Sequence, residues 1–102
     1  MEHVDDRSFE RQVLGSTEPY LLDFSAVWCP PCRALEPILE AIAEEQKGKL
    51  RVGKIDIDSS PEVAARYGVR GAPTVVLFKD GREAGRRLGL TSKRALLQLI
   101  GL

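Results

Sequence analysis

The chain has 102 residues, of which 43% are hydrophobic and 29% charged, as in an ordinary soluble globular protein. Fifteen basic and fifteen acidic residues give a formal net charge of zero, which disfavours a nucleic-acid or anionic-membrane surface, since either needs a basic excess. The length suits one domain over residues 1–102, and no apolar stretch approaches a membrane span.

The N-terminus and the cysteines bear on the compartment. Residues 1–6 contain neither the basic region nor the apolar segment of a signal peptide, so we expect a cytoplasmic protein. The only two cysteines, Cys29 and Cys32, are too few for a disulfide scaffold. In a reducing compartment such a pair either binds a metal or is redox-active.

The predicted elements begin with an edge strand over residues 2–4 and a short helix that Asp5 or Asp6 can cap. Apolar residues recur at helical spacing in that helix at Phe9, Val13 and Leu14. Residues 20–26 are predicted to form a strand buried on both faces, because their apolar residues do not alternate with polar ones.

The longest predicted helix covers residues 33–46. Its apolar stripe consists of Leu35, Ile38, Leu39 and Ile42. Pro37 lies inside it and should kink it, because proline lacks the N–H group and clashes with the preceding turn. A second central strand is predicted over residues 50–57.

The second half begins with Ser59 and Glu62, whose capping-box spacing predicts the start of a short helix that ends at Gly68. A third central strand, a hairpin turn and an antiparallel return strand are predicted at residues 74–78, 79–81 and 82–88. Thr91 or Ser92 caps a last helix. The order βαβαβ followed by ββα indicates an α/β protein with a mixed sheet, a parallel first half and right-handed crossovers.

Motifs along the whole chain resemble those of the thioredoxin family, in the family's order and spacing. They are Asp23-Phe24, Trp28-Cys29-Pro30-Pro31-Cys32, Lys54-Ile55-Asp56-Ile57-Asp58, Tyr67-Gly68-Val69-Arg70-Gly71-Ala72-Pro73-Thr74, Phe78-Lys79-Asp80-Gly81 and Gly89. The resemblance implies the thioredoxin fold, a mixed central sheet of four to five strands flanked by helices on both faces. It also implies thiol–disulfide exchange.

Three positions depart from the family's pattern. Pro30 stands where thioredoxins have glycine, Ser25 where a second tryptophan is usual, and Ala72 where a larger aliphatic residue is common. Two successive prolines fix φ and stiffen the loop that the disulfide must close. We therefore expect Pro30 to tune the redox equilibrium of the pair.

The cysteine chemistry follows from the predicted helix. Cys29 should lie exposed at its N-terminus, where unpaired N–H groups and the helix dipole stabilise a thiolate, the attacking species in disulfide exchange. Cys32 lies one turn further on, close enough to close a ring and resolve a mixed disulfide.

The alternative to a redox pair is a zinc site, which needs about four ligands. The chain adds only His3, which lies far away in sequence and is expected to have no role, so a metal site would need a dimer or ligands from outside the chain. Neither a metal nor a cofactor is expected.

Asp23 is anomalous because it lies in a strand that should be buried, where a carboxyl group must be paired or have a raised pKa. The resemblance implies that Asp23 helps to deprotonate Cys32 through a water and that Lys54 modulates it. The alternatives are a hydrated Asp23 at the strand's end and a Lys54 side chain that reaches solvent.

The resemblance also implies a substrate surface. Pro73 should be cis and lie against the cysteines, exposing the backbone of Ala72 for pairing with a substrate strand. The expected apolar patch around Cys29 consists of Trp28, Pro31, Gly71, Ala72, Pro73 and Gly89. The alternative for Trp28 is simple packing against the sheet, and both roles can hold at once.

The predicted function is therefore that of a monomeric, cytoplasmic protein-disulfide reductase. Its expected partners are protein disulfides and an electron donor resembling thioredoxin reductase, with neither nucleic acid nor membrane. Within the same chemistry the alternative is a thiol oxidase or isomerase. Outside it, the alternatives are a redox-inactive binding or chaperone module and a metal-binding dimer.

Overall fold

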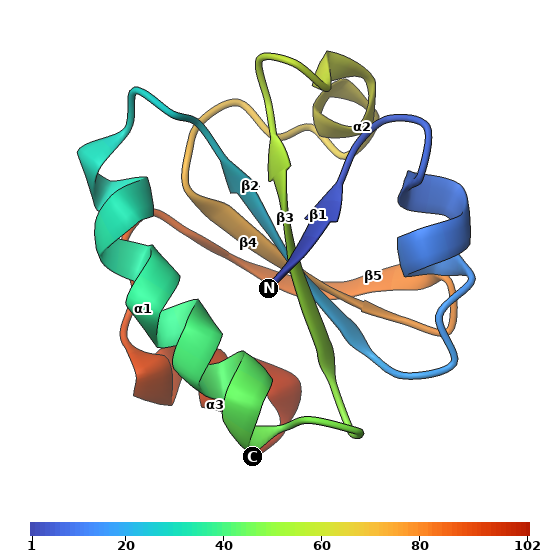
Figure 1. The fold of residues 1–102 in the computed structure, drawn as a ribbon, viewed down its shortest axis with the longest axis vertical. Coiled ribbons are helices and arrows are strands. Elements are labelled where there is room, and N and C mark those ends of the chain that lie inside the picture. Colours follow the sequence, from blue (N-terminus) through green and yellow to red (C-terminus); the bar gives the residue numbers. More distant parts are fainter.

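The computed structural model describes all 102 residues as a five-stranded sheet with helices on both faces (Figure 1). The elements in chain order are β1 (Glu2–Val4), the π-helix η1 (Glu10–Leu14), β2 (Tyr20–Ser25), α1 (Pro30–Glu45), β3 (Arg51–Asp56), α2 (Pro61–Arg66), β4 (Thr74–Lys79), β5 (Arg82–Leu88) and α3 (Lys93–Ile100). The strand order is β1-β3-β2-β4-β5. The first three strands are parallel, and β4 runs antiparallel to both β2 and β5. The predicted fold class and element order are confirmed.

β2 lies at the centre of the sheet, bonded to β3 on one side and to β4 on the other. Its first five residues are fully buried, as the continuous apolar run predicted. Tyr20, Leu22 and Phe24 point into the core beneath η1 and α2, whereas Leu21 packs on the side of α1 and α3. Asp23 therefore points toward α1, because side chains alternate between the faces of a strand.

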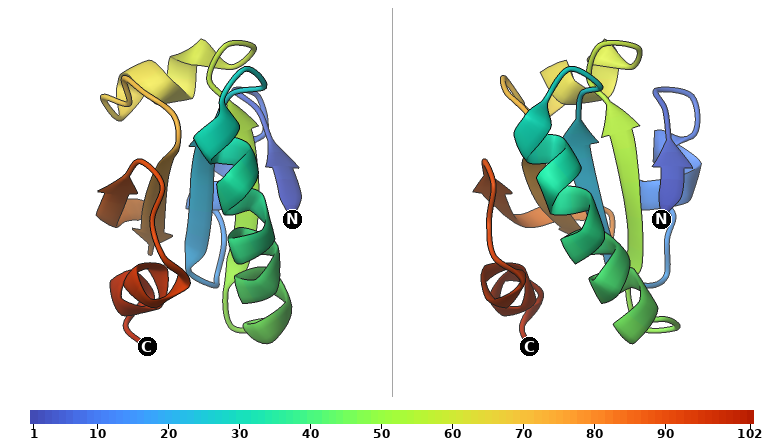
Figure 2. Two further views of the ribbon diagram at one scale, coloured as in Figure 1. Left: turned by 90° about the vertical axis from the view of Figure 1, so that its left-hand side faces the viewer. Right: turned by 60° about the vertical axis from the view of Figure 1, so that its left-hand side comes forward.

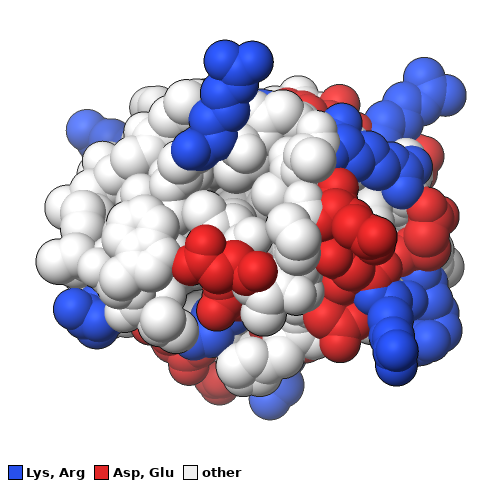
Figure 3. All heavy atoms as spheres, turned by 90° about the horizontal axis from the view of Figure 1, so that it is seen from above, with Lys and Arg blue, Asp and Glu red and all other residues white.

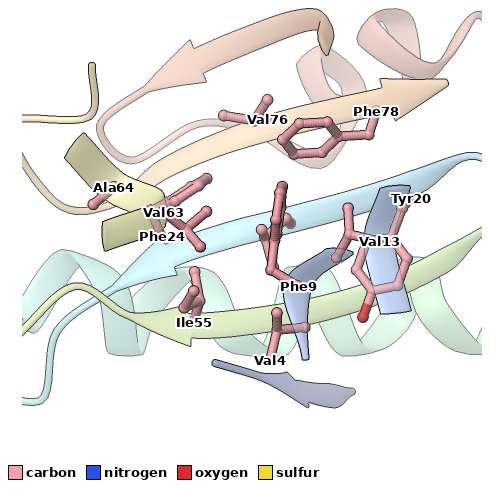
Figure 4. Packing of buried hydrophobic residues seen from close by; sticks show 11 residues of the cluster. Val4, Phe9, Val13, Tyr20, Phe24, Ile55, Val63, Ala64, Val76 and Phe78 are labelled. Carbon is pink, nitrogen blue, oxygen red and sulfur yellow. The ribbon is translucent and has the colours of Figure 1, made fainter. Parts of the chain in front are cut away.

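The core on the η1 and α2 side is aromatic. Eleven buried residues form it, and Figure 4 shows Phe9 in the middle of them. Phe9, Tyr67 and Phe78 meet edge to face, with ring centroids 5.1 to 5.6 Å apart. Such aromatic pairs are worth roughly 0.5–1.5 kcal/mol each beyond the area they bury.

The opposite face carries α1 and α3 (Figure 2). Leu35, Leu39 and Ile42 of the predicted stripe are fully buried there, and Ile38 is half-buried. α1 begins three residues earlier than predicted, since prolines in the first turn lose no intrahelical hydrogen bond. The helix continues without interruption through Pro37. None of the helices combines the length and apolar character needed to cross a bilayer.

The structure corrects two predicted caps. Asp5 caps only a turn, accepting from the N–H groups of Arg7 and Ser8 at 2.9 and 2.8 Å, and the element that follows is a five-residue π-helix. The predicted capping box of Ser59 and Glu62 is wrong, because the helix begins after Ser60, whose side chain does not cap it.

The cap of α2 comes instead from Asp6, a residue 56 positions before Glu62. Its carboxylate accepts from the N–H groups of Glu62 and Val63 at 3.1 and 2.9 Å. In return the Asp6 N–H donates to the Ser60 hydroxyl at 3.3 Å. β1 pairs with β3, so the loops that follow these two strands lie side by side.

Asp6→Ala should lower the free energy of unfolding by about 1 kcal/mol, because two N–H groups of α2 lose their acceptor. Asp6→Asn should retain only part of the stability, because its single amide oxygen can accept from one of the two N–H groups and its NH2 group from neither. Urea denaturation of the three proteins measures the difference. Equal midpoints for wild type and Asp6→Ala would show that the long-range cap does not stabilise α2.

Candidate active site

The two cysteines lie at the N-terminus of α1, just beyond the carboxyl end of β2. Cys29 is the N-cap residue, and its sulfur accepts from the Cys32 N–H at 3.2 Å. The two residues form a disulfide, with their Cα atoms 5.3 Å apart. The helix start therefore directs a backbone N–H at the sulfur of Cys29, an arrangement that stabilises a thiolate after reduction.

The expectation of an exposed Cys29 is wrong for the disulfide form. Cys29 is 2% exposed and Cys32 is 1% exposed. The pair packs with Ala26, and half-buried Ile57 and Ala72 cover it further. The Cys29 sulfur lies 3.5 Å from the carbonyl oxygen of Ala72. A reacting partner must therefore come into direct contact with the chain around Ala72 to reach this sulfur.

The segment before β4 lies beside the disulfide because β2 and β4 are antiparallel. Phe24, near the end of β2, is opposite Thr74, the first residue of β4. The Ala72–Pro73 peptide bond is cis, as the resemblance implies. The Pro73 carbonyl accepts from the Gly89 N–H at 2.8 Å, which joins the segment after β5 to the same site. Gly89 has φ +77°, a conformation that favours glycine.

The surface around Cys29 is apolar and open. Trp28 is 61% exposed, and its indole N–H donates to the Asp58 carboxylate at 2.6 Å. Pro30, Pro31 and Gly71 are exposed, and the space beside the Cα atoms of Gly71 and Gly89 is empty. Figure 3 views the end of the molecule at which β2 and β3 finish, and a broad uncharged area covers one side of it.

The sequence-based patch missed three apolar residues. Val27, Leu88 and Leu90 are 76%, 74% and 57% exposed, which is unusual for large hydrophobic side chains. Each lies directly beside a residue of the motifs, namely Trp28 or Gly89. Their apolar character next to a turn was the signal that could have identified them.

Asp23 is completely buried, and neither of its carboxylate oxygens has a hydrogen-bond partner in the protein. Burial is the largest cause of a pKa raised from 3.8 to about 7, and the charge of Glu36 raises it further while that of Lys54 lowers it. The burial excludes the alternative of a hydrated Asp23 at the strand's end. It leaves a carboxyl group that changes protonation near neutral pH.

Lys54 lies beside Asp23 in the sheet but pairs with another residue. The Cα atoms of Asp23 and Lys54 are register partners, yet the Lys54 ammonium forms an ion pair with Glu36 at 2.8 Å. Sequence reasoning missed Glu36. The signal was its position four residues after Cys32, on the same face of α1, where a charged residue faces the sheet.

The remaining candidates are placed as follows. His3 is exposed on β1, opposite Lys54, and has no cysteine or second histidine beside it. No group of three histidine, cysteine or acidic side chains in the chain is arranged to hold a metal ion. Pro30 is the first residue of α1, and its ring fixes the backbone angle φ between Cys29 and Cys32.

Comparisons with known proteins agree with this geometry. The thioredoxin family matches residues 1–101 of the chain. A thioredoxin of Rickettsia bellii is 46% identical over 98 residues, covering 96% of this chain and 93% of that protein. Thioredoxins of Acidithiobacillus ferridurans and Pseudomonas aeruginosa are 47% and 44% identical over 94 residues, covering 92% of this chain and 87% of each protein.

Asp23→Asn should stabilise the oxidised protein at pH 8. A carboxyl pKa raised from 3.8 to about 7 makes the unfolded state lose its proton first, so stability falls as pH rises from about 4 to 7 and stays low above. Three pH units correspond to roughly 4 kcal/mol at most. Denaturant unfolding at pH 4 and pH 8 should show a gain of roughly 2–4 kcal/mol at pH 8 and almost none at pH 4. A gain that is independent of pH would contradict the raised pKa.

Proposed function

The chain belongs to the thioredoxin family and is a thiol–disulfide oxidoreductase, and we propose that it works as a reductant of protein disulfides through Cys29 and Cys32. The observation that carries the proposal is the position of the pair. A helix N-terminus faces the sulfur of Cys29, and a buried acid lies on the strand that leads into that helix. This arrangement supplies both a stabilised thiolate and an acceptor for the proton of the second thiol.

In the first step the Cys29 thiolate attacks one sulfur of the substrate disulfide. A bond forms between Cys29 and that sulfur, and the other substrate sulfur leaves as a thiolate with the electron pair of the broken bond. In the second step the Cys32 thiolate attacks the sulfur of Cys29. The Cys29–Cys32 disulfide forms, the second substrate sulfur leaves as a thiolate, and two electrons have passed to the substrate.

Cys32 must lose its proton before the second step, and we assign the acceptor role to Asp23. A general base is most effective when its pKa lies near the working pH, and the pKa of Asp23 is raised to about 7. Its oxygens have no hydrogen-bond partner in the protein, so the carboxylate is free to receive the proton, through a water. Lys54 lowers the pKa of Asp23 from the neighbouring strand.

The substrate would bind across the apolar surface around Cys29. The half-buried backbone of Ala72 offers a strand-like partner beside the sulfur, held by Pro73. Trp28 and Pro31 form one side of the surface, and the open spaces at Gly71 and Gly89 let another backbone approach. Such a surface selects extended segments by backbone hydrogen bonds and by apolar contact, not by charge.

A reductase resembling thioredoxin reductase would return the two electrons to the disulfide. We place the protein in the cytoplasm, because cytosolic disulfides are usually transient and catalytic, and the only two cysteines here form the exchange pair. We also propose that it acts as a monomer, since a dimer formed through the apolar surface would cover Cys29.

A turnover assay and a potential measurement together test this function. The wild type should accelerate insulin reduction by dithiothreitol, and Cys29→Ser should fall to the uncatalysed rate. The reduction potential should be about −270 mV, the value already known for thioredoxins. Values of about −180 to −120 mV would instead identify an isomerase or an oxidant. Equal rates for wild type and Cys29→Ser would favour a binding module.

Pro30→Gly should change the equilibrium constant between this protein and glutathione. Proline fixes φ inside the ring that the disulfide closes. Glycine leaves φ free, which changes the relative free energies of the oxidised and reduced forms. A tenfold change in the constant corresponds to about 30 mV or 1.4 kcal/mol. The ratio of oxidised to reduced protein in glutathione buffers measures it. An unchanged constant would show that Pro30 does not tune the pair.

A further inference from the structure

A cavity of about 600 Å³ opens behind the disulfide, and Cys32 is one of its walls. Glu36 of α1 and Lys54 of β3 line the same cavity and form an ion pair at 2.8 Å. Their side chains are 35% and 30% exposed, so the pair is only partly screened by solvent. The cavity therefore combines the resolving cysteine with two opposite charges.

Glu36 faces the groups that would take part in proton transfer, Cys32 on its own helix and Asp23 and Lys54 on the sheet. Cys32 and Glu36 are four residues apart on α1, so they lie on one face of the helix, one turn apart. Leu21 and Val52, two residues before Asp23 and Lys54, both pack in the core on the α1 side. Asp23 and Lys54 therefore point at the same helix face.

Lys54 bonds to only one of the two carboxyl groups near it, Glu36 and not Asp23. Lys54 is the register partner of Asp23, yet its ammonium bonds to Glu36 and leaves both Asp23 oxygens without a protein partner. A second carboxylate thus takes the cation that the buried carboxyl would otherwise attract. A cation within reach favours ionisation of a carboxyl group, and another anion opposes it.

We propose that Glu36 is a positioning residue for proton transfer at Cys32, because it holds the Lys54 ammonium away from Asp23 and adds a negative charge beside it. The inference rests on the proposed function, in which the Cys32 thiol gives its proton to the Asp23 carboxylate before it attacks Cys29. Glu36 touches neither the substrate nor the reacting sulfurs. It sets the pH at which Asp23 holds or releases the proton.

The direction of the Asp23 pKa supports this role. Burial is the main reason that the pKa is raised to about 7, and Glu36 is the one side chain that raises it further. Lys54 acts in the opposite direction. Without Glu36, both the repulsion and the competition for Lys54 would disappear, and each loss favours the ionised carboxylate.

The other charged groups around this site are engaged elsewhere or distant from Asp23 in the sheet. On β4, the residue opposite Asp23 is the uncharged Val75. Four further ionisable residues line the cavity: His3, Asp5, Arg33 and Asp56. Three of them bond to nearby backbone groups, and His3 lies opposite Lys54 on the far strand β1. Glu36 and Lys54 are the one ion pair whose partners line this cavity together with Cys32.

The test is the carboxyl pKa of Asp23, measured by ¹³C NMR in the oxidised protein, where neither cysteine titrates. Glu36→Gln keeps the shape of the side chain and should lower this pKa by roughly one pH unit. The pH profile of insulin reduction should move to lower pH with it. Glu44→Gln, an exposed residue two turns further along α1, is the matched control and should leave both unchanged. An unchanged Asp23 pKa in Glu36→Gln overturns the proposal.

A double-mutant cycle separates the two parts of the effect. Lys54→Met alone should raise the pKa of Asp23, and in that background Glu36→Gln should have a smaller effect, because no ammonium is left to release. An undiminished effect would overturn the claim that Glu36 acts by holding Lys54. The pKa measurements by NMR use oxidised protein and need no turnover. Loss of the proposed reductase role, seen as full activity of Cys29→Ser, would therefore be distinct from failure of this inference.

Discussion

The hydrogen bonding of β2 to β3 on one side and to β4 on the other is the constraint on which the site depends. The parallel register with β3 puts Lys54 beside Asp23. The antiparallel register with β4 puts the start of that strand, and hence Ala72 and Pro73, beside the end of β2. The chain then enters α1 at Cys29. One central strand therefore positions the acid, its cation, the sulfur and the backbone that a substrate would meet.

The electrostatics of the site work against the stability of the fold. A carboxyl group buried without a partner costs free energy once it is ionised, so the central strand would be more stable with an apolar residue in place of Asp23. The ion pair of Glu36 and Lys54 relieves little of that cost, because the ammonium bonds to Glu36 and both Asp23 oxygens are left without a partner in the protein. A carboxyl group that titrates near neutral pH is what proton transfer from a thiol requires. Function explains this placement better than stability does.

Much of the fold could be predicted because its signals are local. The unbroken apolar run of β2, the helical stripe of α1 and the hairpin between β4 and β5 each follow from residues adjacent in sequence. The cap of α2 could not be predicted, because its acceptor, Asp6, belongs to a loop that only the pairing of β1 with β3 brings near. The burial of Cys29 was missed for the same reason, since Ala72 covers it from β4's side of the sheet.

The sequence by itself determined the chemistry of this protein. Two cysteines three positions apart before a helix indicate an exchange pair, and an acid within an apolar strand indicates a raised pKa, whereas the resemblance to thioredoxins is what implies that this acid acts as the base. Only the tertiary structure showed that Glu36 acts on that acid beside Lys54, the residue that the resemblance already implied. Glu36 and Lys54 are 18 residues apart in the chain and meet because α1 packs across β3. Spacing along one element is dictated by the local backbone, whereas contact between elements depends on how the whole chain packs.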